Sequence, residues 1–209
     1  MTRPLRTLIL APLLTALLAL AACAPQGTPP DPRLLVRRSQ IDRAPESLLL
    51  TALPGRGGGT MIVQGRRDGV LTWRTADFIS ISYRDGLLVA TRGLGHDLMS
   101  ADVAGTRAAL SGGPRDDYPR FASFLGPDDE TVLRAFRCRM RDAGPDPVQS
   151  FGLTFPATRL VETCAGTGLR IVNTYWRAPG GGLRRSLQWA GPELGYLETE
   201  QISRDILER

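Results

Sequence analysis

Cys23 stands where its thiol could accept a lipid. Two arginines near the start precede an almost unbroken run of Leu, Ile and Ala over residues 8–20, and Ala21 and Ala22 come directly before the cysteine. A positive start, a short apolar run and small residues before a cut are typical of a secretory signal peptide. The run is too short to span a bilayer together with its flanks. We therefore predict a signal peptide over residues 1–22 and acylation of Cys23.

The segment that ends at Cys23 resembles the lipobox of bacterial lipoproteins. The resemblance implies a diacylglyceryl group on the thiol and a further acyl chain, such as palmitate, on the new N-terminus. Two or more chains hold a protein durably on a membrane. Ala24 in place of Asp favours the outer membrane, by the sorting preference of enteric lipoproteins. An ordinary signal peptide with a chance cysteine and an uncleaved anchor are the alternatives.

Two cysteines remain for the exported part, Cys138 and Cys164. In an oxidising compartment an even pair is first interpreted as a disulfide. They are 26 positions apart, and closing a loop of that length is worth about 3 kcal/mol. A zinc site would need more ligands, and His96 is the only histidine in the sequence. A catalytic thiol would need an activating partner. The disulfide is the leading hypothesis, and we expect no metal and no cofactor.

No segment carries a recognisable catalytic motif. Gly93-Leu94-Gly95 lacks the third glycine and the βαβ setting of a dinucleotide fingerprint. His96 and Asp97 could be a base and its orienting group, but adjacent residues of an extended chain point to opposite faces. A carboxylate pair for glycoside hydrolysis stays open, because the separation that it needs is spatial. Three tryptophans could bind sugar rings, although a core position is more common for this residue in sheet proteins: Trp73, Trp176 and Trp189.

Charge argues against a nucleic-acid partner. All 26 basic residues are arginine and face 21 acids, and the two signs are interleaved along the chain. No stripe of one sign that could follow a phosphate backbone is evident. The segment after Cys23 is rich in proline, with four prolines between Ala24 and Pro32. We expect residues 23–45 to form the lipidated cysteine and a tether, and residues 46–209 to form a single β-rich domain.

Short apolar or alternating runs separated by turn residues predict an all-β, mainly antiparallel fold. About ten short strands should form a meander that closes as a barrel or a sandwich, with one or two short helices. Asp85-Gly86 predicts a tight hairpin between two of the runs. Residues 183–189 alternate in a way that suits a sheet wet on one side. The best helix candidates are Tyr118–Leu125 and Gln201–Arg209. The expected strands are Ser47–Thr51, Met61–Gln64, Val70–Arg74, Phe78–Tyr83, Leu87–Thr91, Thr131–Met140, Thr158–Cys164, Leu169–Trp176, Leu183–Trp189 and Tyr196–Glu200.

Three blocks of sequence resemble the YjbF family of lipoproteins, which is related to the group 4 capsule lipoprotein GfcB: Asp85–Met99, Asn173–Trp176 and Gln188–Gln201. The resemblance implies a mostly β outer-membrane lipoprotein. Its expected partners are a periplasmic protein and a large outer-membrane barrel protein for producing or exporting capsule or exopolysaccharide. No catalytic residues come with the resemblance.

The leading hypothesis is thus a non-enzymatic accessory of polysaccharide export, anchored at the periplasmic face of the outer membrane. A glycan-binding module without a protein partner is the first alternative, and a lipid-anchored polysaccharide-modifying enzyme is the second. We place a candidate binding edge on the loops around 93–99 and 191–196, and we expect Trp189 to be core. The candidate residues of that edge are Arg92, His96, Asp97, Glu193 and Tyr196.

Overall fold

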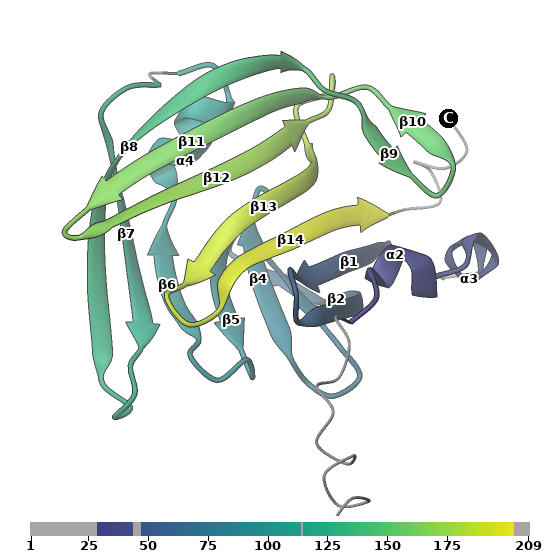
Figure 1. The fold of residues 1–209 in the computed structure, drawn as a ribbon, viewed down its shortest axis with the longest axis horizontal. Coiled ribbons are helices and arrows are strands. Elements are labelled where there is room, and N and C mark those ends of the chain that lie inside the picture. The colour runs from purple at the N-terminus through teal and green to yellow at the C-terminus, as the bar shows by residue number, and fades with distance from the viewer. Residues whose placement is uncertain (1–28, 44–46, 114, 203–209) are drawn as a thin grey trace, which may run out of the picture.

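Antiparallel strands build most of the described part of the chain, as the sequence predicted (Figure 1). The computed structural model describes residues 29–43, 47–113 and 115–202. Twelve strands form one sheet in the order β5-β4-β3-β2-β1-β14-β13-β12-β11-β8-β7-β6, and β9 and β10 form a separate hairpin. The sheet curls until its two edge strands meet, so it is nearly closed as a barrel.

Most strands follow their neighbour in the chain, as a meander requires. The strands are β1 (Leu48–Leu53), β2 (Gly57–Arg67), β3 (Val70–Arg74), β4 (Ser80–Arg84), β5 (Leu87–Arg92), β6 (Leu98–Asp102), β7 (Tyr118–Leu125), β8 (Thr131–Pro145), β9 (Val148–Ser150), β10 (Leu153–Phe155), β11 (Thr158–Gly166), β12 (Leu169–Arg177), β13 (Leu183–Gly191) and β14 (Gly195–Ile202). The described helices are α2 (Pro32–Leu35), α3 (Arg38–Asp42) and α4 (Ala104–Leu110). The Asp85-Gly86 hairpin is confirmed, because both residues have positive φ, 51° and 80°, between β4 and β5.

The main core lies inside the barrel, where aromatic rings fill the space between facing strands. Trp189 packs edge-on against Phe124 at 5.1 Å and Phe136 at 5.8 Å, measured between ring centroids. Trp73 is also buried in this core. Trp176, by contrast, is half-buried and lies on the outer face of β12, opposite Arg159 of β11.

Gln188 ties two strands together across the interior. Its Oε1 accepts from the N–H of Leu88 on β5 at 2.9 Å, and its Nε2 donates to the carbonyl of Gly86 at 2.9 Å. Strands β5 and β13 are not neighbours in the sheet, so this amide takes the place of a strand partner. The polar side of β13 is therefore buried, since Gln188 and Ser186 point into the barrel. The expectation of a wet polar face here is wrong.

Two helix expectations need correction. Tyr118–Leu125 is strand β7, in which alternate residues from Tyr118 to Phe124 are buried. Gln201 and Ile202 complete β14 rather than start a helix, and the rest of Gln201–Arg209 lies outside the described residues. The helix that does form, α4, contacts β7 and β8 and contributes Ala109 and Leu110 to the main core. It is short and lacks a side-chain cap, so the sequence offered little signal for it.

A second, smaller core lies on the outer face of β1 and β14. It joins α3, β1, β10 and β14 through Ile41, Leu50, Phe155 and Ile202. Beside it, two carboxylates of β14 pair with two arginines. Glu198 lies 2.6 Å from Arg33, and Glu200 lies 3.1 Å from Arg33 and 2.8 Å from Arg185. We assigned residues 32–42 to the tether, but they contain the two short helices α2 and α3. Helix α2 packs on β1 and β2.

Candidate functional site

The predicted acyl acceptor, Cys23, lies outside the described residues, and its lipidation stays a prediction. Among the residues that the structure describes, no helix is long and apolar enough to cross a membrane.

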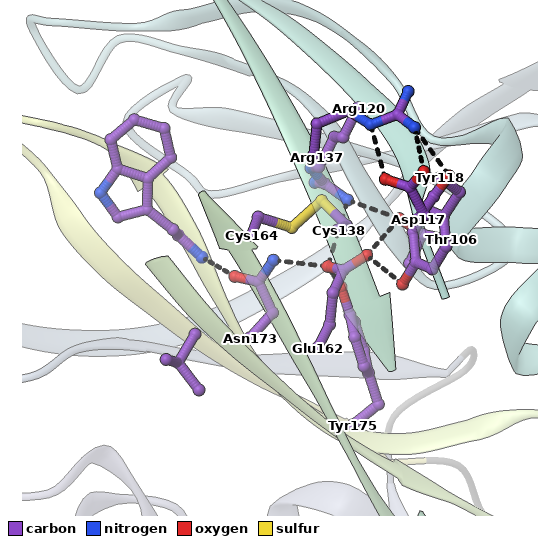
Figure 2. Close-up of a disulfide and its surroundings, with 12 residues drawn as sticks. Thr106, Asp117, Tyr118, Arg120, Arg137, Cys138, Glu162, Cys164, Asn173 and Tyr175 are labelled. Atoms are coloured by element: carbon purple, nitrogen blue, oxygen red, sulfur yellow. Dashed lines mark hydrogen bonds and ion pairs between the residues drawn. A yellow bond between two sulfur atoms is a disulfide. The ribbon is translucent and has the colours of Figure 1, made fainter. Parts of the chain in front are cut away.

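The predicted disulfide is confirmed, because Cys138 and Cys164 are bonded to each other (Figure 2). The two cysteines are register partners on β8 and β11 and are buried on the inner face. Glu162, two positions before Cys164, brings a carboxylate within 4.8 Å of both sulfurs, which is a spacing that could suit a metal ion. Because the sulfurs are bonded to each other, neither offers a thiolate, and this group is a crosslink beside a carboxylate.

Glu162 is the centre of a buried hydrogen-bond network (Figure 2). Its Oε1 accepts from the hydroxyl groups of Thr106 at 2.5 Å and Tyr118 at 2.9 Å. Its Oε2 accepts from Asn173 at 2.7 Å and from the Tyr175 hydroxyl at 2.8 Å. Both carboxylate oxygens are therefore satisfied by side chains from α4, β7 and β12.

The network is closed to solvent. Glu162 has 0% of its surface exposed, and its ion-pair partner Arg120 has 4%. Burial raises the pKa of the Tyr118 and Tyr175 hydroxyls, and the neighbouring Glu162 carboxylate raises both further. A general base must reach the proton of a bound substrate, and this carboxylate faces only the protein's own donors. We assign it to the stability of the barrel.

The predicted binding edge lies where the barrel closes, and two of its residues hold that closure together. The Asp97 carboxylate accepts from the N–H of Gly93 at 2.8 Å, from the N–H of Leu94 at 3.2 Å and from the Thr91 hydroxyl at 2.8 Å. Arg92 donates to the carbonyl of Leu98 at 3.0 Å. Both side chains thus serve the turn from β5 to β6.

The other three edge residues differ in whether their side chains have hydrogen-bond partners. His96 and Glu193 are exposed, and neither side chain makes a hydrogen bond or ion pair with any residue that the structure describes. The Tyr196 hydroxyl accepts from the N–H of Val172 at 3.0 Å. The two loops do come together, because a Cβ on Gly191 would lie 3.9 Å from the carbonyl oxygen of His96. The two loops of the predicted edge are therefore adjacent, but three of the five candidate side chains already have hydrogen-bond partners within the protein.

The expectation that no stripe of one charge exists is wrong for β8. Arg137, Arg139 and Arg141 alternate with buried residues, so all three point to the outer face. The signal was present in the sequence as arginine at every second position around Cys138. It becomes meaningful only once a strand is assigned, because strands place alternate residues on one face.

Comparison with known proteins gives a family match and a fold match. The family described as group 4 capsule polysaccharide lipoprotein gfcB, YjbF, matches residues 15–202. The crystal structure of the hypothetical lipoprotein YmcC from Escherichia coli (K12) superposes with a TM-score of 0.72 at 19% identity, over 80% of this chain and 89% of that chain. At this identity the likeness concerns the fold alone. No curated protein matches the chain.

Proposed function

This chain belongs to the YjbF family of group 4 capsule polysaccharide lipoproteins, and we propose that it is a non-enzymatic accessory of capsule or exopolysaccharide production and export. In this proposal Cys23 is acylated and holds the barrel at the periplasmic face of the outer membrane. The barrel then docks an outer-membrane barrel protein and a periplasmic protein of the same export system.

The extent of the family match carries the proposal. It starts at residue 15, inside the predicted signal segment, and ends at residue 202, the last residue of β14. It therefore includes Cys23, the disulfide and every described strand of the barrel. A match to a family of capsule lipoproteins that spans both the predicted anchor and the barrel supports a role in which the two act together.

A non-catalytic role is supported by the two groups best suited to acid-base chemistry. Glu162 is enclosed and fully hydrogen-bonded, so it faces no space for a substrate. His96 is exposed, and the structure describes no side chain that orients its ring. A catalytic histidine needs an orienting partner and a bound substrate within hydrogen-bond reach.

The anchor is tested by Cys23→Ser in a strain that lacks the chromosomal gene. Wild-type protein should incorporate labelled palmitate, fractionate with the outer membrane and restore polysaccharide secretion. The variant should lose all three, because no other acyl acceptor is proposed. Ala24→Ser is the matched control and should behave as wild type. Secretion that is normal in the deletion strain itself would refute the accessory role.

The partners are tested by affinity purification of the wild-type lipoprotein from solubilised outer membranes. We expect an outer-membrane barrel protein to co-purify with it. Purified protein that turns over the host polysaccharide would instead support the enzyme, and retention of polysaccharide without any protein partner would support the glycan-binding module.

A further inference from the structure

The outer face of β8, β11 and β12 carries a row of arginines. Arg137, Arg139 and Arg141 occupy alternate positions of β8, and alternate residues of a strand are about 6.8 Å apart. The Cα atoms of the three arginines therefore span about 14 Å along one side of the strand.

Small side chains of β11 leave a depression beside this row. Ala165, Thr163 and Val161 are the register partners of Arg137, Arg139 and Arg141. Two adjoining hollows follow the row, and they share Arg139, Thr163 and Asp116 in their linings. Arg159 lines the first hollow and Arg170 of β12 lines the second. We call this feature the arginine groove: Arg137, Arg139, Arg141, Arg159 and Arg170 around a floor of Val161, Thr163 and Ala165.

Three of the five arginines have no counter-charge. The side chains of Arg139, Arg141 and Arg170 make no ion pair or hydrogen bond within the described part of the chain. Arg137 is hydrogen-bonded to Asp117 and thereby lowers the pKa of that carboxyl, and Arg159 lies 3.5 Å from Asp146. Asp116 is the acid that lines both hollows. The groove therefore keeps an excess of positive charge that a bound anion would neutralise.

An aromatic ring lies beside Arg159, outside the linings of the two hollows. Trp176 is half-buried and is the register partner of Arg159. Its indole N–H donates to Asp146 at 3.1 Å, and that carboxylate also pairs with Arg159. The ring is therefore held in one orientation, and the guanidinium group of Arg185 lies over it at 5.8 Å from the ring centroid. Fixed aromatic faces and bidentate guanidinium donors are what a ring bearing an acidic group requires.

We propose that the arginine groove binds an acidic polysaccharide, with the chain lying along β11 and its carboxylate or phosphate groups meeting the arginines of β8 and β12. The inference rests on the proposed role in polysaccharide export and gives that role a ligand class. A repeating polymer fits better than a single small anion, because the guanidinium groups are spread along the strand and do not converge on one point. It also fits better than a flat layer of lipid headgroups, because the charges border a hollow.

The test uses full-length lipoprotein purified in detergent and measures its affinity for polygalacturonate, a polymer with one carboxylate per sugar. Dextran is the uncharged control polymer. The test variant is Arg139→Gln, Arg141→Gln, Arg170→Gln, which removes the three unpaired charges. The matched variant is Arg56→Gln, Arg66→Gln, Arg67→Gln, which removes three exposed charges elsewhere.

Wild-type protein should bind polygalacturonate, should bind it more weakly as salt is raised, and should not bind dextran. The test variant should lose at least tenfold in affinity, and the matched variant less than twofold. Equal losses in both variants would overturn the proposal, because general charge would then explain the binding. So would phosphatidylglycerol vesicles that bind in a groove-dependent way while polygalacturonate does not.

The outcome is separable from the proposed function. If the test variant binds the polymer as well as wild type does, the groove proposal fails while the accessory role stands. If the deletion strain secretes polysaccharide normally, the accessory role fails whatever the purified protein binds.

Discussion

Arg120 of β7 and Glu162 of β11 form an ion pair at 3.6 Å across a strand that lies between them. The intervening strand is β8, which contributes Cys138 to the disulfide. On the inner face, the disulfide joins β8 to β11 and the ion pair joins β7 to β11, so the three neighbouring strands are linked to one another (Figure 2).

Removing the charge of Glu162 should destabilise the barrel strongly. In Glu162→Gln the buried Arg120 loses its counter-charge, and breaking a buried pair in this way costs about 3–5 kcal/mol. Denaturant unfolding of the purified protein measures the effect. Asp117→Asn is the control, because it removes the carboxylate of an exposed arginine pair and should leave the unfolding midpoint nearly unchanged. Equal midpoints for the two variants would contradict the assignment of Glu162 to stability.

Loss of the disulfide should lower stability by a smaller amount. Cys138→Ser removes the crosslink between positions 138 and 164, which is worth about 3 kcal/mol by its loop length. Mass spectrometry of alkylated wild-type protein should find both thiols blocked by one bond. Two freely alkylated cysteines in protein taken from the cell envelope would show that the bond does not form there.

In the turn between β5 and β6, substitution of Asp97 should lower the stability of the protein, whereas substitution of His96 should leave it nearly unchanged. Asp97→Ala removes the acceptor of three hydrogen bonds. It leaves the buried Thr91 hydroxyl without that acceptor, at about 1–3 kcal/mol, and also releases the part-buried N–H groups of Gly93 and Leu94. His96→Gln changes an exposed side chain and should shift stability by less than about 0.5 kcal/mol. It should also preserve polysaccharide secretion. A His96→Gln protein that folds normally yet abolishes secretion would reopen a chemical role for the ring.

High pH should unfold the protein through its buried tyrosines. The pKa values of Tyr83, Tyr118 and Tyr175 are raised above the usual tyrosine value of 10.0, chiefly by burial. The folded state therefore holds these protons more tightly than the unfolded state does. Their contribution to stability is fully present below pH 10 and is lost as the pH rises above that value. Tyrosinate absorbance should increase together with the loss of circular dichroism, and ionisation of these tyrosines in fully folded protein would contradict the prediction.

The sequence was sufficient to predict strands in which apolar residues alternate with polar ones. The β4–β5 hairpin was predictable because Ile81 and Tyr83 alternate with serines and Asp85-Gly86 supplies the turn. Strand β7 was missed because Arg120 and Ser123 interrupt its apolar alternation. What buries Arg120 is a carboxylate 42 positions further along the chain, and no local pattern reveals that partner.

The candidate site was also predictable only in part from the sequence. The sequence placed the two edge loops correctly at one corner, yet Arg92 and Asp97 serve the turn itself. The alternate spacing of Arg137, Arg139 and Arg141 is visible in the sequence, but the net charge of the row depends on which of these arginines pair with a carboxylate. Arg137 is held by Asp117, whereas Arg139 makes no ion pair with any described residue. Pairing is a property of the folded surface and cannot be counted along the chain.

The amide of Gln188 limits the route that a polymer could take in the proposed export role. A strut between β5 and β13, set among packed aromatic rings, makes the interior a solid body and not a conduit. In the proposed export role, a glycan would therefore pass over the exterior of the described barrel, and a pore would have to be supplied by another component.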